Sequence, residues 1–310
     1  MPTRYDQQFR RIARSLSSLE LMRASGDDVA ESSAELVLDK DVGRRFLDFY
    51  GDQGLRLALE RYGIQGALAR RGYPETTLIT RTGDDRHALF VEADVDGTRE
   101  RLIELVVRRD HLVPHLAAQG LPALRDHYRV LTIDWLLLRH PRGRFSAERP
   151  RLPGQDAPGL GIGWRVMSML ARVVARLELD GMVTVAEYLH NAEHYAREMP
   201  CFDPVHHGRL RALLDLLRAE HELDTAQASW AMEWGLVRTR ADDAVLRWRG
   251  ELMVATEDDS LRAYLDSPMH AELAESARKA HRLWLDRAAF DARWASECAT
   301  LTGENAPGGS

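Results

Sequence analysis

The chain has 310 residues, of which 45% are hydrophobic and 29% are charged, and its formal net charge is -6. A chain of this length can bury the core of two domains or of one elaborated domain. Its acidic balance argues against broad affinity for nucleic acid, and no apolar run reaches the length of a membrane span. We therefore expect a globular protein that binds neither nucleic acid nor a membrane.

The cysteine content and the start of the chain both favour the cytoplasm. Only Cys201 and Cys298 are present. Two cysteines are too few for a disulfide scaffold or a thiolate metal site, and they fit a reducing compartment. The first residues interleave apolar side chains with arginines and lack the continuous apolar core of an export signal.

Residues 1–72 are predicted to be helical and to pack as a cap. Apolar residues recur at helical spacing near the start of the chain, at Phe9, Ile12, Leu16 and Leu19. The pattern over 42–71 predicts one or two amphipathic helices, interrupted at Gly51 and Gly54.

From Thr76 onwards the pattern changes to strands. Short apolar stretches over 77–79, 87–92 and 102–107 predict three of them. The last two are joined by Asp94-Val95-Asp96-Gly97, a sequence typical of a hairpin turn. A helix is expected over 112–127, and a long central strand containing Asp134 and Trp135 over 128–138.

The most informative stretch is the triple-glycine turn Gly159-Leu160-Gly161-Ile162-Gly163. Glycines at alternate positions let a backbone turn tightly and bring its amides against an anionic oxygen. A helix that follows such a turn adds the positive end of its dipole. The turn therefore predicts a site for a pyrophosphate, although a tight connection within an α/β domain would use the same residues.

An amphipathic helix is predicted to follow the turn. Its apolar face is formed by Val166, Met169, Leu170, Val173, Val174 and Leu177. Asp180-Gly181 reads as its stop signal, and 182–185 as a short buried strand. A second helix starts near Tyr188 and ends before Pro200.

The last third is expected to be mainly helical and carries no acyltransferase signature. Helices are predicted over 210–217 and 226–237, from Leu261, and over 272–298. A hairpin or strand pair is expected over 245–254. The tail, 302–310, is rich in glycine and proline, and we expect it to be disordered.

From residue 76 to 203 the order of strand, glycine turn, helix, strand and helix resembles the acyl-CoA-binding half of the GNAT superfamily of N-acyltransferases. The resemblance implies that the turn wraps the CoA pyrophosphate and that the strand over 133–138 pairs with the pantetheine arm. It also places Asn191 and Tyr195 near the thioester, with Tyr195 as the general acid. By position, Asp134 and Glu187 are the candidate general bases.

The chain departs from the family pattern in ways that leave a second function open. Pro158 stands where the family prefers Gln or Arg, three residues before the first glycine of its Gly-x-Gly core. Asn191 and Tyr195 are only four residues apart, and an insert over 139–157 separates the strand from the turn. These departures are typical of a catalytically silent domain that binds a ligand or a protein. A dinucleotide-binding unit fits less well, because its third glycine would fall at Trp164 or Val166.

A zinc hydrolase is the third alternative. His190-Asn191-Ala192-Glu193-His194 matches the pattern H-x-x-E-H, in which two histidines one helical turn apart bind zinc and the glutamate activates water. The third ligand cannot be read from the sequence, and Glu272 and Glu275 are guesses. A surface or core pair of histidines would give the same pattern, so zinc is not our expectation.

The sequence thus predicts an α+β protein with a GNAT-like mixed sheet flanked by helices. We expect a helical N-terminal extension over 1–72, an acyl-CoA-binding domain over 73–204, a mainly helical region with a strand pair over 205–300, and a disordered tail over 301–310. The expected function is N-acyl transfer from acetyl-CoA or another acyl-CoA to a small-molecule or protein amine. Whether the chain forms a homodimer stays open.

Overall fold

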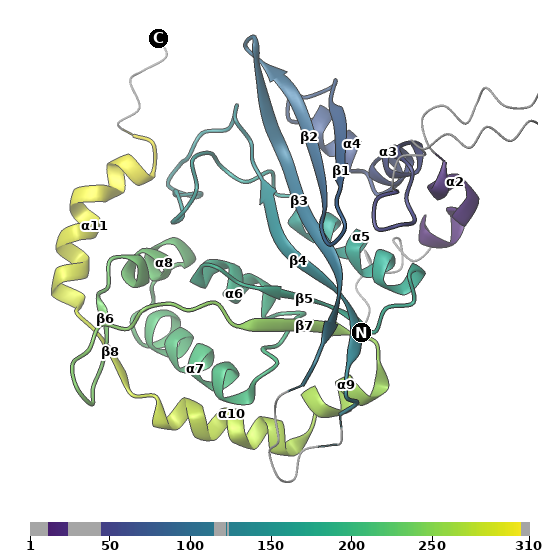
Figure 1. Cartoon of the computed structure of the whole chain (residues 1–310). Coiled ribbons are helices and arrows are strands. Elements are labelled where there is room, and N and C mark those ends of the chain that lie inside the picture. Colours follow the sequence, from purple (N-terminus) through teal and green to yellow (C-terminus); the bar gives the residue numbers. More distant parts are fainter. Residues whose placement is uncertain (1–11, 24–44, 115–121, 123, 305–310) are drawn as a thin grey trace, which may run out of the picture. The chain divides into compact units, whose positions relative to one another are not determined.

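The computed structural model describes residues 12–23, 45–114, 122 and 124–304 (Figure 1). The fold is α+β, as expected, and the described residues form one six-stranded and one two-stranded sheet. The chain forms two compact units, and we describe each by itself. Unit 1 comprises the described residues up to 110 together with 130–142 and 159–179, and unit 2 comprises the described residues of 111–129, 143–158 and 180–304.

Unit 1 begins with short helices, namely α2 (Ser18–Met22), α3 (Asp52–Arg61) and α4 (Ile64–Ala69). Gly51 precedes α3, as predicted, but Gly54 lies within that helix and does not interrupt it. A Cβ atom on Gly54 would lie 2.0 Å from the carbonyl oxygen of Leu21, so this glycine permits close helix packing. The break that separates α3 from α4 is at Gly63, whose φ of 71° favours glycine.

The strands of unit 1 are neighbours in chain order: β1 (Thr77–Thr82), β2 (His87–Val95), β3 (Thr98–Leu112) and β4 (Tyr128–Leu138). β2 pairs antiparallel with both β1 and β3. The hairpin turn is confirmed at Asp96 and Gly97, whose φ angles of 54° and 82° suit a two-residue turn. The predicted strand over 128–138 is also confirmed.

The helix predicted over 112–127 is wrong for the described residues of that range. Leu112 ends β3, and 113–114, 122 and 124–127 are not helical. The rest of the range lies outside the described residues. Leu112 is buried and continues the alternation of β3, so sheet pairing outweighs the helical spacing of its neighbours.

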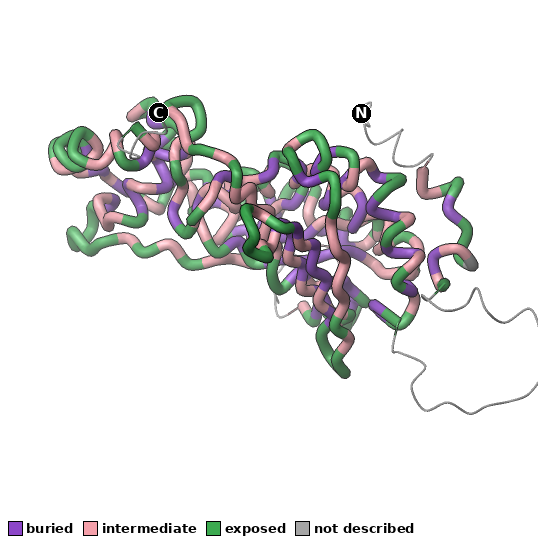
Figure 2. The backbone as a smooth tube through the Cα atoms, turned by 90° about the horizontal axis from the view of Figure 1, so that it is seen from above, coloured by how far each residue is buried: buried purple, intermediate pink, exposed green. Residues whose placement is uncertain are grey.

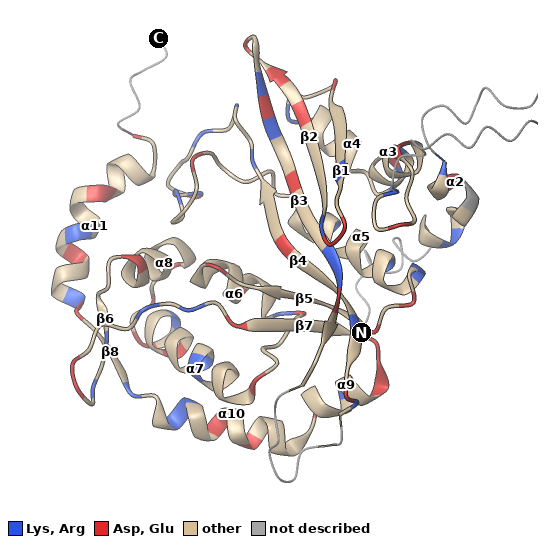
Figure 3. Ribbon diagram, viewed as in Figure 1, with Lys and Arg blue, Asp and Glu red and all other residues tan. Residues whose placement is uncertain are grey.

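Opposite charges alternate on the β2–β3 hairpin (Figure 3). Arg99 lies 3.2 Å from Glu92, and Arg101 lies 2.9 Å from Glu104. The hairpin therefore presents both signs of charge side by side rather than a basic surface.

Helix α5 (Gly163–Arg176) follows the glycine turn and buries Val166, Met167, Met169 and Leu170. It ends earlier than the predicted stop at Asp180-Gly181, because Glu178 adopts the left-handed φ of 51° and Gly181 already belongs to β5. The Arg176 guanidinium donates hydrogen bonds of 2.8 Å to the carbonyl oxygens of Ala13 and Leu16. The end of α5 thus holds the segment at 13–16.

Unit 2 contains β5 (Gly181–Val185), α6 (Leu189–Tyr195), α7 (Pro204–Leu214), a π-helical turn (Asp215–Glu220) and α8 (Thr225–Glu233). The side chain of Asp203 caps α7 by accepting a 2.7 Å hydrogen bond from the Val205 amide. Asp224 and Gln227 form a capping box at the start of α8.

The remaining elements are β6 (Val237–Thr239), β7 (Leu252–Thr256), α9 (Asp259–Leu265), α10 (Pro268–Ala280), β8 (Leu283–Leu285) and α11 (Arg287–Leu301). The single helix predicted over 272–298 is wrong, because β8 interrupts it and pairs with β6. The strand pair predicted over 245–254 is also wrong. Only β7 forms there, and it pairs with β5, while Val245 makes an isolated bridge to Arg238.

Buried, intermediate and exposed residues follow one another along the backbone (Figure 2). In β2 and β3 buried positions alternate with more exposed ones, and α5 buries only part of its residues. None of the described helices is both long and apolar enough to cross a bilayer. The predictions for Phe9 and for 305–310 of the tail lie outside the described residues.

Candidate functional site

The glycine turn lies beside the end of β4, within unit 1. Gly159 forms a bridge with Arg139, and the Leu160 amide donates a 3.2 Å hydrogen bond to the carbonyl oxygen of Leu138. The side chains of Leu160 and Ile162 are fully buried, with exposed fractions of 0% and 1%. Two apolar anchors therefore fix the turn, although the sequence separates it from β4 by the insert over 139–157.

Only one of the three glycines is required by its backbone conformation. Gly161 has a φ of 62°, which side chains disfavour. A Cβ atom on Gly159 would lie 3.5 Å from the Leu138 carbonyl oxygen, and one on Gly163 would lie 3.7 Å from the Leu138 side chain. Both are ordinary contacts, so these two positions have room for a side chain.

The turn presents a row of backbone donors. In the described part of the chain, the amides of Gly161, Ile162 and Gly163 donate no hydrogen bond. Gly163 is the first residue of the 14-residue helix α5, and no side chain of the described residues caps this end. Unpaired amides and the positive end of a helix dipole together favour an anion at this position.

Arg71 brings a positive charge to the same turn. Its Nη2 atom would lie 3.3 Å from a Cβ atom on Gly161, and its Nη1 atom donates a 3.0 Å hydrogen bond to the carbonyl oxygen of Ala67. Sequence reasoning missed this residue, because it lies far from the turn in the chain and belongs to the segment after α4. The sequence contains no local signal that would have revealed it.

The candidate base Asp134 lies on β4 and is engaged by two arginines. Its carboxylate oxygens lie 3.2 Å from Nε of Arg86 and 3.2 Å from Nε of Arg108. The carboxylate is 21% exposed. Both carboxylate oxygens of the candidate base are therefore already engaged by a positive charge.

The other predicted catalytic residues belong to unit 2. Glu187 is exposed in the connection between β5 and α6. Tyr195 is the last residue of α6, and Asn191 lies one helical turn before it, on the same face. Burial raises the pKa of Tyr195, so its hydroxyl keeps the proton at neutral pH. Among the described residues this hydroxyl has no hydrogen-bond partner.

The histidines of the zinc pattern lie in different environments. His190 stacks on Tyr188 with ring centroids 5.4 Å apart, and burial lowers its pKa to about 4. Within the described part of the chain, its buried Nδ1 atom has no hydrogen-bond partner. His194 is exposed, and Glu193 lies 3.0 Å from the Arg218 guanidinium.

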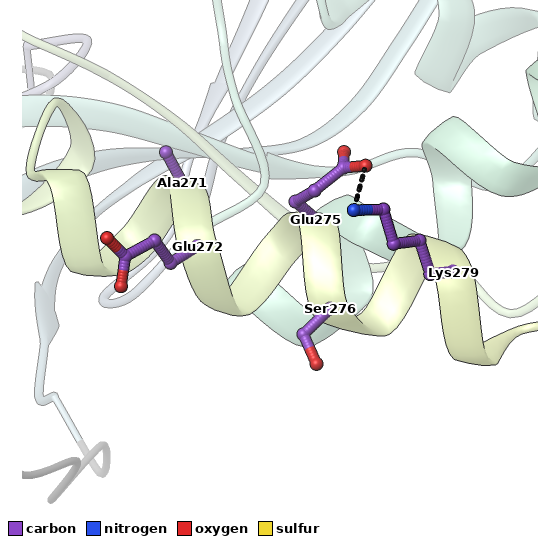
Figure 4. Close-up of a pocket in the computed structure, with 5 residues that line it drawn as sticks. All are labelled: Ala271, Glu272, Glu275, Ser276 and Lys279. Atoms are coloured by element: carbon purple, nitrogen blue, oxygen red, sulfur yellow. Dashed lines mark ion pairs between the residues drawn. The ribbon is translucent and has the colours of Figure 1, made fainter.

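Neither guessed third zinc ligand completes a site. Glu272 and Glu275 line a shallow hollow on α10, where Glu275 points to Lys279 at 3.5 Å and Glu272 points away from that pair (Figure 4). Glu275 also binds Arg278 at 2.8 Å. Across the described residues, no three His, Cys, Asp or Glu side chains are arranged to hold a metal ion.

No protein-family model matches this chain, and no curated protein matches it significantly. The function must therefore be argued from the site alone.

Proposed function

We propose that the glycine turn binds the pyrophosphate of an acyl-CoA, and that the protein is a GNAT-like N-acyltransferase acting on an amine. The observation that carries this proposal is the row of three amides at Gly161, Ile162 and Gly163, which have no partner among the described residues, with the Arg71 guanidinium beside them. Pro158 stands at the position where the GNAT family prefers Gln or Arg. Arg71 supplies a positive charge from another part of unit 1.

The chemistry of the proposed transfer needs few groups. A neutral amine attacks the thioester carbonyl carbon, and the C–S bond breaks to release the CoA thiolate. The GNAT resemblance gives Tyr195 the role of donating a proton to that thiolate, and the raised pKa of Tyr195 means that its proton is present at neutral pH. The proton lost by the amine passes to Asp134, Glu187 or water.

A titration of acetyl-CoA and of a longer acyl-CoA into the metal-free protein tests the binding step. The decisive variant is Gly163→Glu, with Gly163→Gln as its control. The two side chains have the same size, and position 163 has an ordinary φ with room for a Cβ atom. An acidic residue in the first turn of a helix also favours the helix, so folding should survive. We expect the Glu variant to lose binding and the Gln variant to retain most of it.

Arg71→Gln gives a second, independent measure, with Arg70→Gln as the control for overall charge. Loss of a charge-assisted hydrogen bond to a phosphate should weaken binding by about ten- to a hundredfold at position 71. At the exposed position 70 the change should be small. Absence of binding to either acyl-CoA would remove the acyltransferase proposal.

The silent binding domain stays the second candidate, and the two ion pairs of Asp134 favour it. It predicts that an acyl-CoA or another phosphate ligand binds while no acyl-CoA is consumed with any amine. An acceptor screen that follows the release of free thiol separates the two candidates.

A further inference from the structure

A cavity in unit 1 lies among α3, α4, β1 and β2, and its volume is about 200 Å³. Pockets for drug-sized ligands usually measure about 300–1,000 Å³, so this one suits a smaller molecule. It is lined by Arg56, Leu59, Glu60, Gln65, Thr76, Leu78 and Val91.

Opposite charges flank the cavity. Arg56 and Glu60 are exposed and lie one turn apart on α3. Residues at this spacing often form an ion pair with each other. Here, among the described residues, neither side chain makes a hydrogen bond or an ion pair. A guanidinium and a carboxylate are therefore both open to a ligand.

The floor of the cavity is apolar. Leu59 and Val91 are buried, with exposed fractions of 5% and 1%, and Leu78 is half-buried. In the wall, the Gln65 amide donates a 2.9 Å hydrogen bond to the Thr76 hydroxyl. This contact satisfies the side-chain polar atoms of Gln65 and Thr76. The apolar floor and the two charges are therefore the features that can recognise a ligand.

We propose that this cavity binds a free α-amino acid with an apolar side chain. Its carboxylate would pair with Arg56, its ammonium with Glu60, and its side chain would cover Leu59, Leu78 and Val91. Charged residues one helical turn apart have Cβ atoms about 5–6 Å from each other, which suits the adjacent charges of a zwitterion. Because Glu60 favours the protonated ammonium, the bound amino acid is not a nucleophile. The site is independent of the proposed acyl transfer.

Calorimetric titration of leucine into the full-length protein, without acyl-CoA, tests the proposal. Two analogues separate its charges, since leucinamide lacks the carboxylate and 4-methylpentanoate lacks the ammonium. We expect millimolar or tighter binding of leucine, and binding of each analogue that is weaker by about tenfold or more, as expected for the loss of a charge-assisted hydrogen bond.

Variants of α3 assign the contacts. Arg56→Gln and Glu60→Gln should each weaken leucine binding by about tenfold or more. Arg61→Gln removes a charge from the same helix outside the cavity and should leave binding unchanged. Neither Arg56 nor Glu60 has a partner to lose among the described residues, so both variants should fold. Failure to bind leucine, equal binding of either analogue, or unchanged binding by either cavity variant would overturn the proposal.

Discussion

The contact between α7 and α10 gives a sharp test of the packing in unit 2. A Cβ atom on Gly208 of α7 would lie 2.1 Å from the carbonyl oxygen of Ala274 and 2.8 Å from the Ala277 Cβ atom, both on α10. The nearest atom belongs to backbone, so no side-chain rotation can relieve the clash. Gly208→Ala therefore forces the two helices apart.

Two effects of this substitution oppose each other. In a helix interior, alanine is favoured over glycine by about 1 kcal/mol. Overpacking a core costs about 1–3 kcal/mol, and a backbone clash at 2.1 Å places this site at the upper end. The net effect should be a loss of about 1–2 kcal/mol in the free energy of unfolding.

Gly66→Ala is the matched control. Gly66 is also helical, and among the described residues its Cβ atom would meet only the end of the flexible Arg70 side chain, at 3.6 Å. We expect this variant to gain up to about 1 kcal/mol. Urea unfolding followed by circular dichroism measures both changes against the parent protein. A Gly208→Ala protein as stable as the parent would show that α7 and α10 do not approach as closely as described.

Three further predictions concern protonation, the turn and catalysis. The rings of His207 and His270 lie 5.7 Å apart, and burial lowers the pKa of both. The free energy of unfolding should therefore fall as the pH drops below about 6.5 towards their folded-state pKa values. His270→Gln should flatten this dependence when unfolding is measured from neutral to acidic pH. Gly161→Ala should lower the melting temperature, because the φ of residue 161 is 62°. Gly163→Ala should leave the melting temperature unchanged or raise it, because position 163 has an ordinary φ and room for a Cβ atom. Equal effects of the two variants would contradict the assigned backbone. If acyl transfer is found, Tyr195→Phe should lower kcat by about a hundredfold or more with little change in acyl-CoA affinity, and unchanged turnover would exclude Tyr195 as the acid.

Local patterns were sufficient to predict most of unit 1. The hairpin at Asp96-Gly97 and the strand over 128–138 are encoded by turn chemistry and by a long apolar run. The errors have tertiary causes. In the sequence alone Gly54 resembles a helix breaker, but the structure shows that it lets α3 pack against the backbone of Leu21. The strand β8 has only three residues, so the sequence around it fits a continuous helix unless its pairing with β6 is known.

The same limit applies to the candidate site. The sequence located the turn, but it gave the three glycines equal weight, whereas the conformation requires glycine only at 161. Arg71 could not be found, since no spacing rule connects it to the turn. The arginines that engage Asp134 were likewise hidden, because Arg86 precedes β2 and Arg108 lies on β3.

Anion binding at the turn and acyl transfer need different groups. Anion binding at the turn needs only unpaired amides and a nearby positive charge, and the described residues of unit 1 supply both. Transfer also needs a proton acceptor, and the Asp134 carboxylate already contacts two guanidinium groups while Glu187 is exposed to water. The proposed reaction therefore favours an acceptor amine that arrives neutral, because such an amine can attack the thioester before any residue removes a proton from it. An acceptor screen should accordingly begin with weakly basic amines.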